Sequence, residues 1–379
     1  MERGAKIKYK KDHRIYATSM PYIVIDIFHI LSRDIIWNNT SYIVWWDHSF
    51  LQSSNYMEII LAIVSVIGWL VLLTFGGNNL VDGAVSLAKK YKISEAIIGL
   101  TIVAIGTSMP EMVVSFLAAV QGNTEIAIGN VIGSNIANVF LILGITTIIA
   151  KMHFSTIARF FDLPVMIFST LLLLLLASDR LMDGSMRDVI SRADGIIFMI
   201  FAVLYILYSL RHNNFQPDKS EEIGIIESNS KLTLSLVWGI VALFLGWKIL
   251  VDGAVWLATI MGLSQSIIGL TIIAIGTSAP ELVTSILASR RWSPDLAIGN
   301  VIGSNILNIL IVLGVTAVIA PIPFLAASYI DALLALFAPV ILLIMALFWS
   351  NNTIWRREGI LMITIYMTYI GYLISKEML

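Results

Sequence analysis

The sequence predicts an all-α polytopic membrane protein with ten transmembrane helices in two inverted-topology five-helix repeats. The 379 residues are 58% hydrophobic and only 13% charged, and their mean hydropathy is +0.87. Several apolar runs reach the roughly 20 residues that a helix needs to cross the hydrocarbon of a bilayer. A seventeen-residue stretch occurs twice, at Gly99 to Ser115 and at Gly269 to Ser285. Composition therefore predicts the membrane class, and the repetition predicts two related halves.

Composition also argues against several classes of function. The chain has no cysteine, which excludes disulfides and thiolate-metal sites. Its net charge of −1 and the lack of a basic patch argue against a nucleic-acid partner. The five histidines lie in the N-terminal stretch or in predicted loops, without the spacing of a metal site. Zinc and copper sites are therefore not expected.

The apolar pattern divides the chain into four parts. Residues 1–56 are basic and then aromatic, and we expect an N-terminal extension that is either interfacial or precedes the natural start at Met57. A first five-helix repeat is expected at 57–210, a polar cytoplasmic linker at 211–232 and a second five-helix repeat at 233–379. The expected spans are 58–80, 94–121, 126–148, 161–178, 194–210, 233–257, 264–289, 296–318, 328–349 and 359–375.

The two halves are related by a constant shift of 170 residues, as from Glu111 to Glu281. The shift holds without an insertion from Val81 and Val251 to Gly144 and Gly314, which indicates an internal duplication. Because each half carries an odd number of spans, the second half must enter the membrane from the opposite side. This inverted-topology repeat is typical of secondary transporters.

Loop charge predicts the orientation of the spans. The loops on one side hold 12 Lys and Arg residues, and the connections on the other side hold 4. The positive-inside rule therefore places both ends of the ten-span unit outside. The loops predicted inside are 89–92, 149–160, 211–232, 290–295 and 350–358.

Each copy of the repeated stretch is interrupted by Gly-Thr-Ser-x-Pro-Glu. Pro110 lacks an N–H and clashes with the carbonyl of Gly106, four residues earlier, and Pro280 relates to Gly276 in the same way. Unpaired backbone at membrane depth is tolerated only where protein or a hydrated cavity covers it. Broken helices at matching positions therefore point to an ion site at the membrane midplane. The carbonyls expected to be freed are those around 104–107 and 274–277.

Glu111 and Glu281 follow the two helix breaks. An acidic side chain inside a membrane is functional by default, and a structural, hydrogen-bonded carboxyl is the alternative. Carboxylates, freed carbonyls and hydroxyls form an oxygen-only set, which suits Ca²⁺ and, by the same hard-ligand logic, Na⁺. The hydroxyls belong to Thr107, Ser108, Thr277 and Ser278.

The span after each break carries a second repeated element, AIGNVIGSNIAN at 127–138 and AIGNVIGSNILN at 297–308. Its Ser and its last Asn are four residues apart and so share one helix face, which we expect to line the ion path rather than only to pack. These residues are Ser134 and Asn138, and Ser304 and Asn308. The remaining amides could bond across helices, either Asn130 and Asn300 or Asn135 and Asn305.

Asp82 and Asp252 also match across the repeat. They lie near the ends of the long first and sixth spans, and we favour a helix-end or gating role for them over ion ligation.

With these residues in view, the sequence resembles the sodium/calcium exchanger family of the cation/calcium antiporter superfamily, in its prokaryotic type without regulatory domains. The resemblance rests on GTSMPE and GTSAPE together with the two GNVIGSN stretches. It implies ten helices in two inverted halves, with four ion sites between helices two, three, seven and eight. It makes Glu111 and Glu281 the central acidic ligands. The other ligands it implies are Thr107, Ser108, Thr277, Ser278, Ser134, Asn138, Ser304, Asn308 and the carbonyls of Ala104 and Ala274.

One position departs from some well-characterised members, which carry Asp where this chain has Asn308. Two asparagines leave only two carboxylates, whose combined charge of −2 would neutralise one Ca²⁺. This departure leaves the ion stoichiometry and the coupling to sodium open.

The predicted function is secondary active antiport of Ca²⁺ against Na⁺ by alternating access, with the long first and sixth spans sliding over a fixed core. Both ions would compete for the same two glutamates, and repulsion between the empty carboxylates would keep the unloaded protein from crossing. The alternatives are Ca²⁺/H⁺ or K⁺-dependent exchange and transport of another divalent cation such as Mg²⁺ or Mn²⁺. A passive cation channel and an intramembrane enzyme are further alternatives.

The expected partners are the Ca²⁺ and Na⁺ substrates and the lipid bilayer. No cofactor, no catalytic residue, no nucleic acid and no protein partner are expected, and the protein is predicted to be a monomer. The expected location is a prokaryotic inner membrane, which the chain crosses several times.

Overall fold

The structure is a computed structural model, and it describes most of the chain from residue 55 onward. The predicted N-terminal extension, most of the linker and the first half of the seventh expected span lie outside the described residues. The described ranges are 55–122, 124–182, 184, 186–211, 229–260, 274–291, 293–348 and 353–378.

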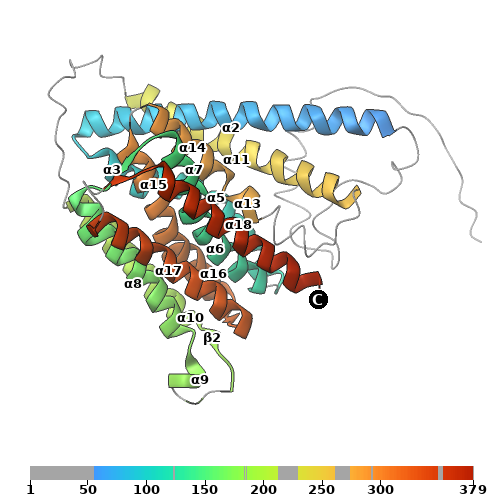
Figure 1. Ribbon diagram of the computed structural model, residues 1–379, viewed down its shortest axis with the longest axis vertical. Coiled ribbons are helices and arrows are strands. Elements are labelled where there is room, and N and C mark those ends of the chain that lie inside the picture. Colours follow the sequence, from blue (N-terminus) through green and yellow to red (C-terminus); the bar gives the residue numbers. More distant parts are fainter. Residues whose placement is uncertain are drawn as a thin grey trace, which may run out of the picture. The chain divides into compact units, whose positions relative to one another are not determined.

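Helices make up almost all of the described chain (Figure 1). The first half contains α2 (Asn55–Tyr91), α3 (Glu95–Ile98), η3 (Gly99–Val103), α4 (Ala104–Thr107), α5 (Met109–Val120), α6 (Thr124–Ala137), η4 (Asn138–Leu143), α7 (Gly144–Ile149), η5 (Ala158–Asp162), α8 (Leu163–Leu176), α9 (Asp179–Met182) and α10 (Arg192–Arg211). The second half contains α11 (Asn229–Ile260), α13 (Ala274–Thr277), α14 (Ala279–Arg290), α15 (Pro294–Leu307), η7 (Asn308–Leu313), α16 (Gly314–Ile319), α17 (Ala326–Phe348) and α18 (Arg356–Met378).

Seven helices among the described residues are long and apolar enough to cross a membrane. The count rises to eight if the bent pair Glu95–Thr107 and Met109–Val120 forms one span. The expected first span falls within α2, and the expected seventh span is only partly described. The helical membrane fold is therefore confirmed, while the count of ten in inverted repeats stays a prediction.

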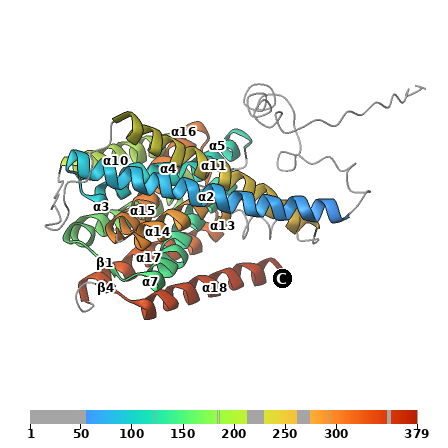
Figure 2. The same ribbon diagram turned by 90° about the horizontal axis from the view of Figure 1, so that it is seen from above.

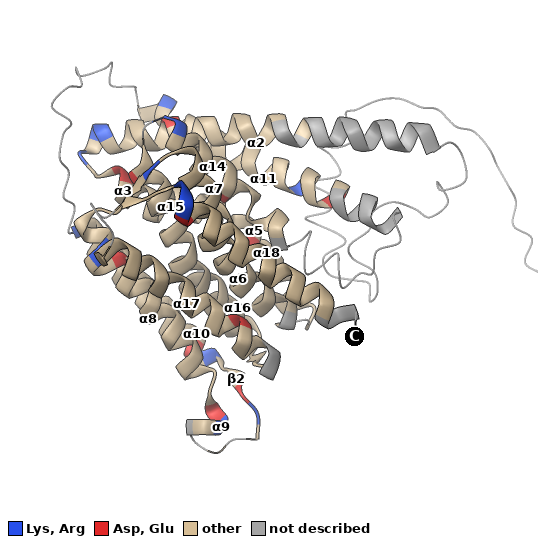
Figure 3. Cartoon of the chain, viewed as in Figure 1, with Lys and Arg blue, Asp and Glu red and all other residues tan. Residues whose placement is uncertain are grey.

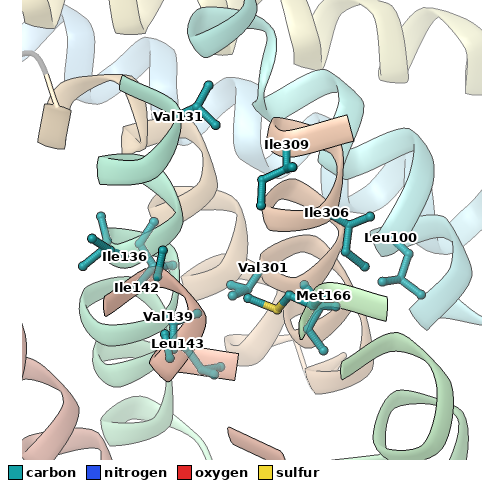
Figure 4. Close-up of a cluster of buried hydrophobic side chains, with 14 of the residues drawn as sticks. Leu100, Val131, Ile136, Val139, Ile142, Leu143, Met166, Val301, Ile306 and Ile309 are labelled. Atoms are coloured by element: carbon teal, nitrogen blue, oxygen red, sulfur yellow. The ribbon is translucent and has the colours of Figure 1, made fainter. Parts of the chain in front are cut away.

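The helices that carry the second repeated element lie at the centre. In the apolar windows of 126–149 and 294–319, 72% and 78% of the residues are buried, against 17–39% in the other candidate spans. Figure 4 shows the cluster of buried hydrophobic side chains around them, in which Leu100 lies beside Ile306. Glycine permits this packing, because a Cβ at Gly303 would lie 2.6 Å from the Leu100 carbonyl oxygen. The polar residues of the element are thereby held in the interior.

The long helices α2 and α11 pack against each other along one side of the core (Figures 1 and 2). A Cβ at Gly76 would lie 2.7 Å from the backbone nitrogen of Leu243, and one at Gly239 would lie 2.7 Å from that of Leu80. Residues later in α2 therefore contact residues earlier in α11, which makes the pair antiparallel. The hydroxyl of Ser235 also donates to the carbonyl of Asn79 (2.9 Å).

Charged residues gather mainly at the ends of the helices, and the body between them is almost uncharged (Figure 3). Two short strand pairs tie loops together at these ends. The strand β1 (Met152–His153) pairs with β4 (Thr353–Ile354), and β2 (Val189–Ile190) pairs with β3 (Ile322–Pro323). Each pair joins two loops that the charge count places on the same side of the membrane.

We predict that Gly239→Ala lowers the melting temperature, because the added methyl group would press on the backbone of Leu80. Overpacking of this kind costs about 1–3 kcal/mol. The matched control is Gly371→Ala, where a Cβ would meet nothing within 4 Å. Thermal unfolding of the purified protein in detergent measures both variants. Equal melting temperatures would contradict the close contact between α2 and α11.

Candidate ion-binding site

The two predicted helix breaks are present and have the same geometry. The bend between α4 and α5 is 45° and lies at Ser108, whose backbone has φ −82° and ψ 9°. Ser278, between α13 and α14, has φ −85° and ψ 8°. Both values fall in the sparsely populated bridge region, where many active-site residues lie. Pro110 and Pro280 start the helices that follow, where a missing N–H costs nothing.

The breaks place Glu111 and Glu281 in the first turn of α5 and α14, where both side chains are 0% exposed. One oxygen of Glu111 accepts hydrogen bonds from the hydroxyls of Ser134 (3.2 Å) and Ser278 (3.4 Å). Glu281 accepts from Ser108 (3.1 Å) and Ser304 (3.4 Å) in the same way. Each carboxyl is therefore held by one serine from its own half and one from the other half.

The threonines before the breaks complete this connection between the halves. Thr107 donates to the amide oxygen of Asn300 (3.0 Å), and Thr277 donates to that of Asn130 (3.3 Å). The amide nitrogen of Asn130 then donates to the backbone carbonyl of Glu111 (3.1 Å). The helix that carries each glutamate is thus fixed by a chain of bonds that reaches the opposite break.

Four buried side-chain oxygens of the site have no hydrogen-bond partner among the described residues. They are Oε2 of Glu111 and Glu281 and Oδ1 of Asn138 and Asn308. A buried polar group without a partner costs about 1–3 kcal/mol, and such groups are rare in native proteins. All four can act as acceptors, so a cation bound among them would supply the partner that they lack.

The expectation about freed carbonyls is wrong for Ala104. Its carbonyl accepts from the backbone N–H of Ser108 (3.0 Å). The reason is the spacing, because Pro110 removes the bond to Gly106 and leaves the bond to Ala104 intact. Ala274 starts α13 at the matching position. The second lone pair of such a carbonyl stays available to an ion.

The other predicted ligands lie together at the two helix breaks and on the facing central helices. All eight hydroxyl and carboxyl side chains belong to the bonds described above, and Asn138 and Asn308 lie at the starts of η4 and η7. These two segments are π-helical, a feature that the sequence analysis missed and that is frequent at functional sites. Ser115 and Ser285 were also missed, although they match across the repeat, and they accept from Asn130 (3.0 Å) and Asn300 (3.1 Å).

The candidate metal ligands are all oxygen atoms, and only two of the side chains that supply them carry a charge. Among the described residues, no group of three or more His, Cys, Asp or Glu side chains lies close enough to hold a metal ion. The site therefore relies on two carboxylates supported by hydroxyl, amide and carbonyl oxygens. Such neutral oxygens are typical ligands of hard cations.

Comparison with known proteins agrees with this geometry. A model of the sodium/calcium exchanger protein family matches residues 61–211 and 231–375. The chain belongs to the sodium/calcium exchanger family. This membership makes the protein an integral, multi-pass membrane protein that carries out cation/Ca²⁺ antiport, and it is not an enzyme.

Individual known proteins resemble the chain over most of its length. It is 38% identical over 323 residues to the putative antiporter CaxA of Alkalimonas amylolytica, covering 83% of this chain and 98% of CaxA. It is 37% identical over 274 residues to the inner membrane protein YrbG of Escherichia coli (strain K12), covering 69% and 81%. The sodium-calcium exchanger NCX_Mj, soaked with 10 mM Na⁺ and no Ca²⁺, superposes with a TM-score of 0.71 at 28% identity, covering 83% and 99%.

We predict that Glu111→Gln and Glu281→Gln each weaken Ca²⁺ binding about a hundredfold, because each removes one of two buried charges from the site. Hydrogen bonds and contacts that involve a charge contribute about 1.5–3 kcal/mol. Isothermal titration of Ca²⁺ into the purified protein measures the change. The matched control is Glu358→Gln, since this half-buried glutamate caps α18 through the N–H of Trp355 (2.9 Å). Wild-type affinity in either buried variant would contradict the site.

Proposed function

We propose that the protein exchanges Ca²⁺ for Na⁺ across a membrane by alternating access. The observation that carries the proposal is the set of four unpaired buried oxygens, two from glutamates and two from asparagines. Two carboxylates match the charge of one Ca²⁺, or of two Na⁺ ions. The neighbouring neutral oxygens suit the six to eight ligands that Ca²⁺ accepts in flexible geometry.

The ligand chemistry also favours Ca²⁺ over the smaller divalent ions. Mg²⁺ demands a tight octahedral site and keeps several of its waters. Here the four unpaired oxygens come from four separate elements, α5, η4, α14 and η7, and hydroxyl and amide bonds link the site across the two halves. Ligands assembled in this way can adjust to the larger Ca²⁺ ion more readily than they can form the rigid octahedron that Mg²⁺ requires.

Obligatory exchange follows from the two glutamates. Without a cation, two carboxylates held in a poorly solvated centre repel each other and lack donors for their second oxygens. Closing the empty site to water, which alternating access requires, therefore costs free energy. Either Ca²⁺ or Na⁺ relieves this penalty, and so the loaded forms are the ones that cross.

The moving element in this proposal is the antiparallel pair of α2 and α11. Glycines on both helices bring the two backbones into close contact. At one end of α2, Arg291, which follows α14, pairs with Asp82 and donates to the Asn78 side chain (2.5 Å). The matching positions on α11 behave differently, because Asp252 pairs with Lys248 of its own helix (2.7 Å).

Among the described residues, an ion pair between the core and the long helix is present at Asp82 and is not found at the matching Asp252. The residue that matches Arg291 is Gln121, which has no charge to offer Asp252. A helix-end or gating role for Asp82 stays a prediction, and its contact with Arg291 supports it. We infer that the pair stabilises the conformation seen here relative to the oppositely facing one.

We predict that Arg291→Gln shifts the conformational equilibrium by up to about fivefold, since an exposed ion pair contributes roughly 0.2–1 kcal/mol. Because the chain has no cysteine, spin labels at Val71→Cys on α2 and Val120→Cys on α5 report the position of α2. Their distance distribution measures the shift. The matched control is Lys248→Gln, which breaks a pair within α11 and leaves the distribution unchanged. Identical distributions for all three proteins would contradict the role of Arg291.

The deciding experiment is Ca²⁺ uptake into liposomes that contain the purified protein. We predict uptake when Na⁺ is inside and absent outside, and no uptake when the vesicles hold choline. Vesicles loaded with K⁺ or made acidic inside run in parallel, because they separate K⁺-dependent and Ca²⁺/H⁺ exchange from the proposed mode. Replacing Ca²⁺ by Mg²⁺ or Mn²⁺ tests the divalent ion.

The outcomes separate the candidate functions. Uptake that is driven equally well by a proton gradient would replace Na⁺ by H⁺ as the coupling ion. Ca²⁺ flux without any counter-ion would show a passive channel. Vesicles with Glu111→Gln or Glu281→Gln provide the control, since Gln has the shape of Glu and removes a charge of the site, and we expect no uptake from either variant.

We further propose that the protein acts as a monomer in a prokaryotic inner membrane. The inner-membrane location is supported by the similarity to YrbG and by the 12 Lys and Arg residues in the loops predicted to face the cytoplasm. The ligands described above all come from one chain, so the site is assembled without a partner subunit.

A further inference from the structure

Asn135 and Asn305 lie beside the candidate site and belong to a network that the antiport mechanism above does not use. Asn135 comes from α6 and Asn305 from α15, and both side chains are buried (4% and 1% exposed). Neither donates to or accepts from the two glutamates in the bonds that the structure shows. Their bonds run instead to each other's backbone and to the two site asparagines, and Asn305 also contacts the sulfur of Met166 (4.0 Å).

The two residues form a reciprocal pair of hydrogen bonds across the centre of the protein. The amide nitrogen of Asn135 donates to the backbone carbonyl of Asn305 (3.1 Å), and that of Asn305 donates to the backbone carbonyl of Asn135 (3.3 Å). A backbone carbonyl only accepts hydrogen bonds. It therefore fixes which end of each side-chain amide faces it, namely the NH₂ group.

This orientation leaves the amide oxygen of each residue facing a site asparagine. Asn308 donates its Nδ2 to Oδ1 of Asn135 (3.1 Å), and Asn138 donates its Nδ2 to Oδ1 of Asn305 (3.0 Å). The orientation of the first amide thus determines that of the second. The oxygens left over are Oδ1 of Asn308 and Asn138, which are two of the four unpaired buried oxygens of the site.

We propose that Asn135 and Asn305 are positioning residues that make the amides of Asn308 and Asn138 present oxygen, and never nitrogen, to a bound cation. The inference rests on the proposed function in that Asn308 and Asn138 serve as cation ligands. An amide free to rotate would offer its NH₂ group to the cation in half of its orientations, and this group repels a cation. Each relay starts from a backbone carbonyl and ends on an ion ligand.

The relay also limits which side chains suit position 308. A carboxylate there would set one of its oxygens against Oδ1 of Asn135, so that two acceptors face each other without a hydrogen. An amide avoids this conflict, because its NH₂ group fills the gap. The neutral ligand at Asn308 and the amide at Asn135 are therefore matched to each other.

The expected energetic coupling joins residues of different halves. Asn135 acts on Asn308 of the other half, and Asn305 acts on Asn138. Asn135 and Asn138 are three residues apart on one helical segment but do not share such a bond. Energetic coupling is therefore expected across the two halves and not between sequence neighbours.

The test is a double-mutant cycle on Ca²⁺ affinity, measured by isothermal titration on the full-length protein in detergent. We expect Asn135→Leu to weaken binding about tenfold, the lower end of the effect of losing a residue that orients a metal ligand. Asn308→Leu removes the ligand itself and weakens binding at least as much. The double variant should match Asn308→Leu within about twofold, because Asn135 has nothing left to orient.

The matched control is the cycle of Asn135→Leu with Asn138→Leu, for which the losses should multiply to about a hundredfold. A purely structural role for Asn135 would lower the melting temperature without ions but give multiplicative losses in both cycles, which would overturn the proposal. If Asn135→Leu does not fold, the twin cycle of Asn305→Leu with Asn138→Leu carries the same expectation. A wild-type protein without saturable Ca²⁺ binding would refute the proposed function, whereas normal wild-type binding with multiplicative losses refutes only the positioning role.

Discussion

Glu111 and Glu281 each keep one carboxylate oxygen without a hydrogen-bond donor in the part of the chain that the structure describes. The rest of the core is arranged so that these oxygens stay buried and unpaired. The helix breaks place the glutamates in the first turns of α5 and α14, and serines hold their other oxygens. Such an arrangement is unfavourable without a cation and favourable with one.

The site requires both halves of the chain at once. Ser278 bonds to Glu111 and Ser108 bonds to Glu281, so neither carboxyl is satisfied by its own half. Asn135 and Asn305 also connect the halves, because the side chain of each donates to the backbone carbonyl of the other. Because the centre is tied together in this way, a conformational change is more readily accommodated at the periphery, where α2 and α11 contact the core through glycines. In the proposed mechanism, the ion pair of Arg291 would act on the moving helix α2 and not on the site.

Symmetry at the centre and asymmetry at the ends have different physical consequences. The hydrogen bonds of the centre occur in matched pairs that are related by the 170-residue shift. The two conformations that face opposite sides of the membrane would therefore treat the ions alike. The contacts of Asp82 and Asp252 differ, and a difference of this kind is needed to favour one conformation over the other.

The sequence by itself determined the helical membrane fold, the duplication and the residues that gather at the centre, because hydropathy, a constant shift and a Pro-Glu break are all local patterns. It identified Glu111 and Glu281 and the serines and asparagines near them. It misjudged the carbonyl of Ala104 and did not show which serine bonds to which glutamate. Only the tertiary structure decided these pairings and the orientation of the Asn138 and Asn308 amides, because each depends on a donor or acceptor that lies far away in the sequence.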